Sequence, residues 1–444
     1  AGTGKRRPSL NLAITSRGLS SSPPTPDDND QYLGIDLGTS GIRAILIDTA
    51  ECILAEARSD LPAPVQQGDT IEQDPHIWWQ GLSDVLQHLG DKISLASVRA
   101  MVVDGTSSTL LLADNAGQPL HAALMYNDSR AQNQLPRLKQ LAPADSPVLS
   151  ASSGLAKLLW LSEQPFARQA HFALHQADWI AGKLAGHYGF SDPNNALKTG
   201  YDAEQGRWPD WLQQLPLVSN WLPKIYSQAS VVCAIDPTIA DRFGLPQHTQ
   251  IISGTTDSTA SFIATGASQV GEAVTALGST LVLKIIAATP ITDMRYGIYS
   301  QPLGEHWLVG GASNSGGAVL QHFFSNQQMA QLESRLRPDA PTGLDYYPLL
   351  TKGERFPINA ADWAPRLSPR PEADWQFFQA MLEGIATIEK LGYERLTECG
   401  APWPSSIRTT GGGSRNSAWT KIRTRLLNVP MQTTDHSEAA FGSA

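Results

Sequence analysis

The sequence predicts an α/β protein built from two domains of similar size. Its 444 residues exceed what one ordinary hydrophobic core holds, and they suit two domains of about 200 residues each. Glycine-rich turns repeatedly follow or join short runs of β-branched residues, a pattern that is typical of strand ends. A strand, turn and strand near the start recur after about half of the chain, which indicates two copies of one fold.

The composition is that of a soluble globular protein, with 41% hydrophobic and 17% charged residues. No apolar run approaches the roughly 20 residues that span a bilayer, so no membrane partner is expected. The net charge of -9 argues against a general nucleic-acid-binding protein, which would need a basic surface. Cys52, Cys233 and Cys399 lie far apart without CxxC spacing, which favours neither a zinc site nor a disulfide framework.

Residues 1–30 differ from the rest of the chain. The stretch up to Pro26 contains no Asp or Glu, but it carries Arg6, Arg7, Arg17 and a run of serines. Such acid-poor leaders, rich in Arg and Ser, resemble organelle transit peptides. A disordered tail is the alternative, and either interpretation sets residues 1–30 apart from the fold.

Two hairpins are predicted at corresponding places in the two halves. Residues 32–48 alternate apolar side chains around a Gly38-Thr39-Ser40-Gly41 turn, and residues 274–286 do so around Gly278-Ser279-Thr280. The domain boundary is expected near Gln250, which gives domains 31–250 and 251–444. Other predicted segments are helices at 77–89, 153–162, 172–184 and 258–265, a buried strand at 102–104, and an irregular surface segment at 208–223.

The first turn can handle phosphate. Asp36 ends the strand that precedes it, where a carboxylate can hold Mg²⁺ directly or through water. Gly38, Thr39 and Ser40 place bare amides and hydroxyls where β- and γ-phosphate oxygens can approach. The alternative is an ordinary glycine-rich hairpin with an incidental Asp.

Asp257 follows the tight Gly254-Thr255-Thr256 turn and begins a helix of small residues. One interpretation makes this carboxylate a helix N-cap. The other makes it the general base that takes the proton from a sugar hydroxyl as that oxygen attacks the γ-phosphorus.

Three later turns complete the set. Gly278, Ser279 and Thr280 form a second candidate phosphate clamp, and Gly311 lies in the glycine-rich segment 310–317. The third turn, at 411–413, follows a strand and precedes a helix. Its Gly412 and Gly413 remove side chains so that a flat ring can lie on the backbone, while Asn416 and Trp419 could recognise and flank adenine.

In this order, the motifs resemble those of the FGGY carbohydrate kinases, from residue 31 onward. The resemblance implies two ribonuclease H-like domains of the actin and hexokinase ATPase type, flanking a central cleft, with ATP and Mg²⁺ as cofactors. It assigns the first phosphate motif to GIDLGTSG and the catalytic base to Asp257 in GTTDSTAS. It assigns the second phosphate motif to ALGST and the adenosine motif to TGGGSRNSAW.

Residues 103–109, Val-Asp-Gly-Thr-Ser-Ser-Thr, bear on which sugar is the phosphoryl acceptor. Xylulokinases carry a Met-His pair there and glycerol kinases an Arg-Glu pair, and this sequence has neither. The segment looks more like the ribulokinase-like branch, and the chain resembles the plant and cyanobacterial group labelled xylulose kinase 1. That resemblance implies D-ribulose as acceptor, with Asp36, Ser107 and Asp257 touching the sugar, and with the leader it implies a plastid location. A polar segment at 127–130 is expected to order the acceptor side.

Two functions remain open from the sequence. The first is an ATP-dependent kinase of a ketopentose, D-ribulose or alternatively D-xylulose. The second is a nucleotide-gated binding protein that hydrolyses ATP slowly without a sugar, because this fold superfamily also contains chaperones and filament proteins. Asp257 and the polar segments at 103–109 and 127–130 favour the kinase.

Overall fold

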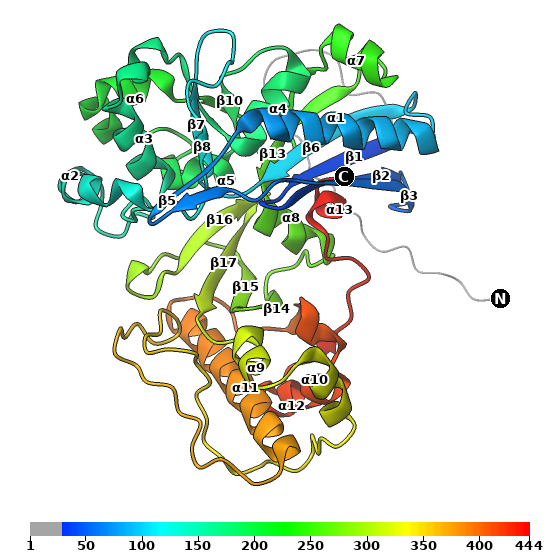
Figure 1. The fold of residues 1–444 in the computed structure, drawn as a ribbon, viewed down its shortest axis with the longest axis vertical. Helices are drawn as coiled ribbons and strands as arrows, with labels where there is room; N and C mark the ends of the chain where they lie inside the picture. Colours follow the sequence, from blue (N-terminus) through cyan, green and yellow to red (C-terminus); the bar gives the residue numbers. More distant parts are fainter. Residues whose placement is uncertain (1–28) are drawn as a thin grey trace.

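Two α/β domains, one above the other, make up the computed structural model, which describes residues 29–444 (Figure 1). The transit-peptide prediction for residues 1–30 lies, except for its last two residues, outside the described part. Within 29–444, no helix combines the length and apolarity needed to cross a membrane.

The first domain is centred on a six-stranded sheet in the order β12-β13-β6-β1-β2-β3. The strands are β1 (Gln31–Leu37), β2 (Gly41–Asp48), β3 (Ile53–Asp60), β6 (Val98–Gly105), β12 (Val231–Ala234) and β13 (Gln250–Thr256). β1 and β2 form the predicted antiparallel hairpin, and β1, β6 and β13 run parallel. In this register Asp36 lies opposite Asp104, and Asp104 lies opposite Thr255. The carboxyl ends of three strands therefore meet beside Asp257.

Helices α1, α4 and α7 pack on one face of this sheet, and α8 and α13 lie on the other side (Figure 1). Their bounds are α1 (Pro75–Lys92), α4 (Gln176–Ala185), α7 (Pro237–Phe243), α8 (Asp257–Ala264) and α13 (Ala439–Ser443). The prediction of a helix at 77–89 is confirmed. α1 begins at an Asp74 side chain that accepts the His76 N–H, and it buries Trp78 and Val85 in the core.

A side layer extends the first domain around a small sheet in the order β4-β5-β8-β7-β9. Its strands are β4 (Val65–Gln67), β5 (Thr70–Gln73), β7 (Leu110–Ala113), β8 (Ala123–Leu124) and β9 (Phe172–His175), beside the short pair β10 (Phe190–Ser191) and β11 (Lys224–Ile225). Its helices are α2 (Leu135–Leu141), α3 (Gly154–Ser162), α5 (Pro193–Ala196) and α6 (Pro216–Trp221).

Two sequence predictions fail in this layer. Residues 172–184 were expected to be one helix, but 172–175 form β9 and α4 starts only at Gln176. The run is apolar in both halves, and pairing with β7 decides the first half. The segment 208–223 is not an irregular surface segment, since it contains α6 and buries Leu212 and Trp221 in a separate core.

The second domain repeats the plan around a sheet in the order β16-β17-β15-β14-β18-β19. The strands are β14 (Glu272–Leu277), β15 (Leu281–Ala287), β16 (Tyr299–Leu303), β17 (His306–Ser313), β18 (Ser406–Thr410) and β19 (Met431–Gln432). The helices are α9 (Gly317–Phe323), α10 (Asn326–Glu333), α11 (Asp374–Glu398) and α12 (Ser417–Leu427). The hairpin β14–β15 beside parallel β18 matches the hairpin β1–β2 beside parallel β6, which confirms the predicted recurrence.

The division between the two sheets comes later in the chain than the predicted boundary at Gln250. β13 begins at Gln250, yet it pairs with β6 and so belongs to the first sheet. The second sheet starts at Glu272, after α8. A β-branched run predicts a strand, but only tertiary pairing decides which sheet that strand joins.

The chain then returns to the first domain. After β19 it leaves the second domain, and α13 packs against α8 and β1 (Figure 1). The fit is close, because a Cβ on Gly34 would overlap the Ala440 carbonyl oxygen and a Cβ on Gly442 would overlap that of Ala260. Segments far apart in the sequence thus meet at the junction of the domains.

Candidate active site

Three aspartates meet at the carboxyl ends of β1, β6 and β13. The carboxyl groups of Asp36 and Asp104 are neighbours that shift each other's pKa, and both are close enough to Asp257 to interact with its charge. Asp36 and Asp257 were predicted from the sequence, and the structure brings them together. The predicted site residues do not include Asp104, although a lone acid at the end of a buried strand is a signal that the sequence offers.

Asp104 is fully buried, and its surroundings decide where the proton lies. The Ser443 hydroxyl on α13 donates to Asp104 Oδ2, while Oδ1 has no hydrogen-bond partner within the described residues. Burial raises the pKa of Asp104 well above its usual range, and the charge of Asp36 raises it further. Burial also raises the pKa of Asp36, and the neighbouring Asp104 carboxyl opposes this rise. Burial raises the pKa of Asp104 more strongly than that of Asp36, so Asp104 is the acid of the pair that takes up a proton first.

Asp257 has the pKa of a competent general base. Burial raises its pKa to about 6, and the negative charge of Asp36 adds to this rise. The Ser258 N–H, which donates to Asp257 Oδ1 at 2.6 Å, and the charges of Lys284 and Lys198 oppose it. Thr256 occupies the N-cap position of α8 and Asp257 is the first helical residue, so the N-cap interpretation of Asp257 is wrong.

The first phosphate turn lies where the sequence placed it, between β1 and β2. The Gly38 N–H donates to the Gly41 carbonyl at 2.9 Å, which closes the turn. The carbonyls of Thr39 and Ser40 are held by the Gln73 amide and the Leu61 N–H, while the Thr39 and Ser40 side chains remain partly or fully exposed. The turn can therefore present hydroxyl groups outward.

Ser107 lies in a rigid loop after β6. Thr106 is tied to the Gln176 side chain, and Ser108 has a positive φ of 68°. The buried Lys157 ammonium donates to the Ser108 carbonyl at 2.8 Å and the Met125 carbonyl at 2.6 Å. Ser107 itself is half-exposed, so the loop holds its hydroxyl in place without covering it.

The segment at 127–130, predicted to order the acceptor side, forms ion pairs that hold neighbouring elements in place. Asp128 is fully buried and accepts the Ile71 N–H at 2.6 Å and the Arg130 guanidinium at 2.7 Å, and Arg130 also binds Glu72. This network fixes β5 next to the loop that Lys157 holds.

Hydrogen bonds from the start of α9 hold the second phosphate turn in place. The Gly317 N–H donates to the Gly278 carbonyl at 2.8 Å, and the Ala318 N–H donates to the Ser279 carbonyl at 3.1 Å. The start of α9 therefore fixes the turn at 278–280 through the Gly278 and Ser279 carbonyls. Gly311 lies within β17 instead, where its missing Cβ makes room for the Phe356 ring. Packing explains this glycine, and nothing in its position indicates contact with ATP.

The structure changes the predicted roles of some residues in the adenosine motif. Gly412 is open, with no atom of the described residues near the position of a Cβ, whereas a Cβ on Gly413 would overlap the Trp419 ring. The Asn416 side chain caps α12 by accepting the Trp419 N–H at 2.7 Å. Trp419 is buried, and its indole donates to the Leu382 carbonyl at 3.1 Å. Trp419 is therefore a core residue, and its burial argues against the predicted contact with adenine.

The acid pair suits a magnesium ion that is shared with nucleotide phosphates. Mg²⁺ in such sites takes one or two carboxylates together with phosphate and water oxygens. Asp36 supplies one carboxyl group, and Asp104 Oδ1 supplies a buried oxygen that has no hydrogen-bond partner among residues 29–444. Among residues 29–444 no group of three His, Cys, Asp or Glu side chains forms a metal cage, so Asp36 would need the nucleotide to complete such a site.

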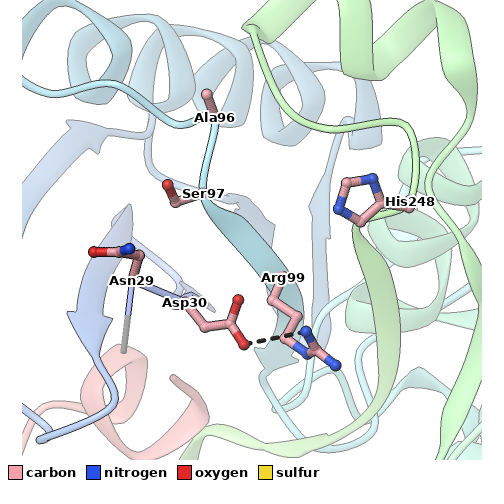
Figure 2. A pocket seen from close by; sticks show the side chains of 6 residues that line it. All are labelled: Asn29, Asp30, Ala96, Ser97, Arg99 and His248. Atoms are coloured by element: carbon pink, nitrogen blue, oxygen red, sulfur yellow. Dashed lines mark ion pairs between the residues drawn. The ribbon is translucent and has the colours of Figure 1, made fainter. Parts of the chain in front are cut away.

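A polar pocket lies at the other edge of the same sheet. Figure 2 shows it at the amino ends of β1, β6 and β13, with Arg99 paired to Asp30 at 3.1 Å and His248 close by. The three aspartates lie at the carboxyl ends of these strands, where binding sites of open α/β sheets occur. This pocket is therefore separate from the candidate active site.

Comparison with known families decides the identity of the fold. The N-terminal domain of the FGGY family of carbohydrate kinases matches residues 31–264, and the C-terminal domain matches residues 273–444. The chain belongs to the FGGY family of carbohydrate kinases. It is an enzyme of the sugar kinase class, as the sequence motifs indicated, with ATP as its phosphoryl donor.

Relatives and solved structures agree with this family. The xylulose kinase of Escherichia coli (strain K12) is 25% identical over 433 residues, covering 91% of this chain and 86% of the relative. The gluconokinase of Bacillus subtilis (strain 168) is 22% identical, covering 92% and 85%.

Among crystal structures, the xylulose kinase from Rhodospirillum rubrum matches with a TM-score of 0.82 at 22% identity, covering 93% of this chain and 88% of that one. The Plasmodium falciparum glycerol kinase with ADP matches with a TM-score of 0.79 at 16% identity, with the same coverage. These two likenesses show the fold.

Proposed function

We propose that this FGGY kinase transfers the γ-phosphoryl group of MgATP to a ketopentose, converting D-ribulose to D-ribulose 5-phosphate. One observation carries the proposal. Asp257, whose pKa burial raises to about 6, lies at the junction of the two domains beside Asp36, so one carboxylate is available for a proton and another for a metal ion.

The reaction balances with these groups. The acceptor hydroxyl oxygen forms a bond to the γ-phosphorus, and the bond between that phosphorus and the bridging oxygen to the β-phosphate breaks. Asp257 takes the hydroxyl proton, and ADP leaves with the electron pair. The Thr39 and Ser40 amides and the amides of the turn at 278–280 stabilise the negative charge on the phosphoryl oxygens.

Asp36 would hold the magnesium ion, which supplies charge neutralisation on the β- and γ-phosphates when bound. Asp104 takes up a proton before Asp36 does, because burial raises the pKa of Asp104 more strongly, and this leaves the Asp36 carboxylate for the metal ion. Ser107, on the loop that Lys157 fixes, is the residue that we assign to a sugar hydroxyl.

D-ribulose is preferred because of the segment 103–109, which carries hydroxyl side chains where other branches of the family carry Met-His or Arg-Glu pairs. A site built from hydroxyls discriminates strongly through its own polar groups. D-xylulose is the second candidate, since several of the matching relatives are named xylulose kinases.

A coupled ADP-release assay with product identification tests the proposal. D-ribulose, D-xylulose, L-ribulose, gluconate and glycerol are compared at equal concentrations, together with a reaction without sugar. We expect the highest kcat/KM with D-ribulose and phosphate on its C5 hydroxyl. A higher kcat/KM with D-xylulose would contradict the choice of sugar, and ADP release that no acceptor stimulates would contradict the kinase reaction itself.

A further inference from the structure

Two lysines from different domains lie beside Asp257, and the mechanism above gives neither a role. Lys284 belongs to β15 of the second domain, and Lys198 belongs to the 3-10 turn Leu197–Thr199 of the first. The charges of both act on Asp257, and the two ammonium groups also repel each other. Two positive charges therefore converge at the place where phosphoryl transfer would occur.

Lys284 reaches this place because β15 presents one face toward α8. Val282 and Ile286 lie on the same face of the strand, and Ile286 packs against Phe262 of α8. Across the sheet, Lys284 is paired with Gly310, whose missing Cβ leaves room for the lysine stem. The ammonium group then donates to the Ser258 carbonyl at 2.9 Å and the Ser258 hydroxyl at 3.0 Å. It therefore lies one residue from the proposed base.

Lys198 reaches the same place from the first domain. It follows α5, which is anchored to the end of β13 by two amides. The Asn195 amide donates to the Thr255 carbonyl at 3.1 Å, and the Asn194 amide donates to the Thr255 hydroxyl at 2.9 Å. The Lys198 ammonium lies 5.2 Å from the ring centre of Tyr299, a residue of the second domain. Lys198 is thus held at the junction of the domains.

The two lysines share the nearby charge of Asp257 without forming a direct ion pair. Among the residues that the structure describes, neither Lys198 nor Lys284 forms an ion pair with a carboxylate, in contrast to the paired arginines Arg130, Arg408 and Arg423. The two ammonium groups still repel each other in the presence of Asp257, and a further anion bound between them would lower that cost. A phosphoryl group that carries about two negative charges has the chemistry to fill that place.

We propose that Lys198 and Lys284 bind the γ-phosphoryl group of ATP from opposite domains and remain in contact with it during transfer. Lys284 lies on the strand that starts at the second phosphate turn, so its ammonium group can leave Ser258 for a phosphoryl oxygen without any change in the backbone. Because each lysine belongs to a different domain, the phosphoryl group also joins the two domains. This inference rests on the proposed kinase reaction, but not on the identity of the sugar.

Nucleotide binding without a sugar tests this inference. The dissociation constants of ADP and of the nonhydrolysable ATP analogue AMP-PNP, both with Mg²⁺, are measured by isothermal titration calorimetry. The variants are Lys198→Met, Lys284→Met and Lys284→Arg. Lys139→Met, on an exposed position of α2, is the matched control. Thermal unfolding of each variant shows whether it is folded.

We expect each Met variant to weaken AMP-PNP binding by about tenfold or more while the Kd of ADP changes by less than about twofold. Lys284→Arg keeps the charge and should retain part of the preference for AMP-PNP. With the acceptor that the wild type uses, kcat should fall by about 10²-fold in Lys284→Met, with a smaller change in the KM of the sugar.

An AMP-PNP to ADP affinity ratio that is the same in the wild type and in both Met variants overturns the inference, whatever the sugar. Equal weakening of both nucleotides together with a lower melting temperature also overturns it, because that result means that the lysines only hold the domains together. A wild type that phosphorylates another sugar refutes the choice of D-ribulose and leaves this test intact.

Discussion

Asp257→Asn is the sharpest test of the proposed chemistry, because the amide keeps the shape of the side chain and removes the base. The amide oxygen of the substituted side chain can still accept the Ser258 N–H at the start of α8, so we expect the fold and ATP binding to be nearly unchanged. General-base assistance contributes about 10²–10⁴-fold to the rate, which sets the expected loss in kcat. Asp91→Asn, on the exposed end of α1, is the control and should keep full activity.

The pH profile sharpens this test. With a pKa of about 6, Asp257 is about nine-tenths ionised at pH 7 and about one-tenth ionised at pH 5, so wild-type kcat/KM should fall about tenfold over that interval. A carboxyl with the ordinary pKa of 3.8 would lose less than about a tenth of its ionised form. Initial rates at subsaturating sugar and saturating MgATP measure the profile.

Two results would refute the reasoning about Asp257. The first is a kcat of Asp257→Asn within about threefold of the wild type, because loss of the general base should reduce the rate far more than that. The second is a residual activity in the variant that falls between pH 7 and pH 5 as steeply as the wild type does. That outcome would assign the titration to another group.

Three further predictions concern stability. Asp104→Asn should stabilise the protein at pH 8. Burial raises the pKa of Asp104 in the folded state, so the stability of the wild type falls as the pH rises above about 4. The difference in melting temperature between the variant and the wild type should therefore shrink on acidification. A variant that melts below the wild type at pH 8 would contradict this. Arg423→Met should lower the free energy of unfolding, measured with urea, by about 3–5 kcal/mol, because it leaves the fully buried Glu389 without its ion-pair partner. Arg207→Met, at an exposed ion pair, should lower it by less than about 1 kcal/mol. Equal losses in these two variants would argue against the buried ion pair. Gly34→Ala should lower the melting temperature by overlap with the Ala440 carbonyl, a loss of about 1–3 kcal/mol, while Gly90→Ala in α1, with open space around it, should not. An unchanged Gly34→Ala melting temperature would show that α13 does not pack tightly on β1.

Much of the fold could be predicted from local patterns. The hairpins at the start of each domain and α1 follow from alternation, glycine turns and a 3.6-residue period, which act over a few neighbouring residues. Residues 172–175 could not be assigned in this way, because an apolar run satisfies both helix and strand until a partner strand chooses. The division between the sheets was misplaced for the same reason, since pairing of β13 with β6 is a contact between distant segments.

The candidate site divides in the same way. Asp36, Asp257 and the two phosphate turns carry local signatures, because a glycine turn after a strand must present its amides at the sheet edge. Trp419 and Gly311 also lie in glycine-rich segments, but their neighbours Leu382 and Phe356 come from elsewhere in the chain and make them packing residues.

The sequence by itself determined the family, the two-domain plan and the order of the phosphate-handling turns, because those depend on short runs of residues whose backbone preferences act locally. Only the tertiary structure decided that Asp104 joins Asp36 and that lysines from both domains face Asp257. The physical reason is that the ionisation and contacts of a buried charge depend on burial and on the groups around it, and these are set by segments hundreds of residues apart.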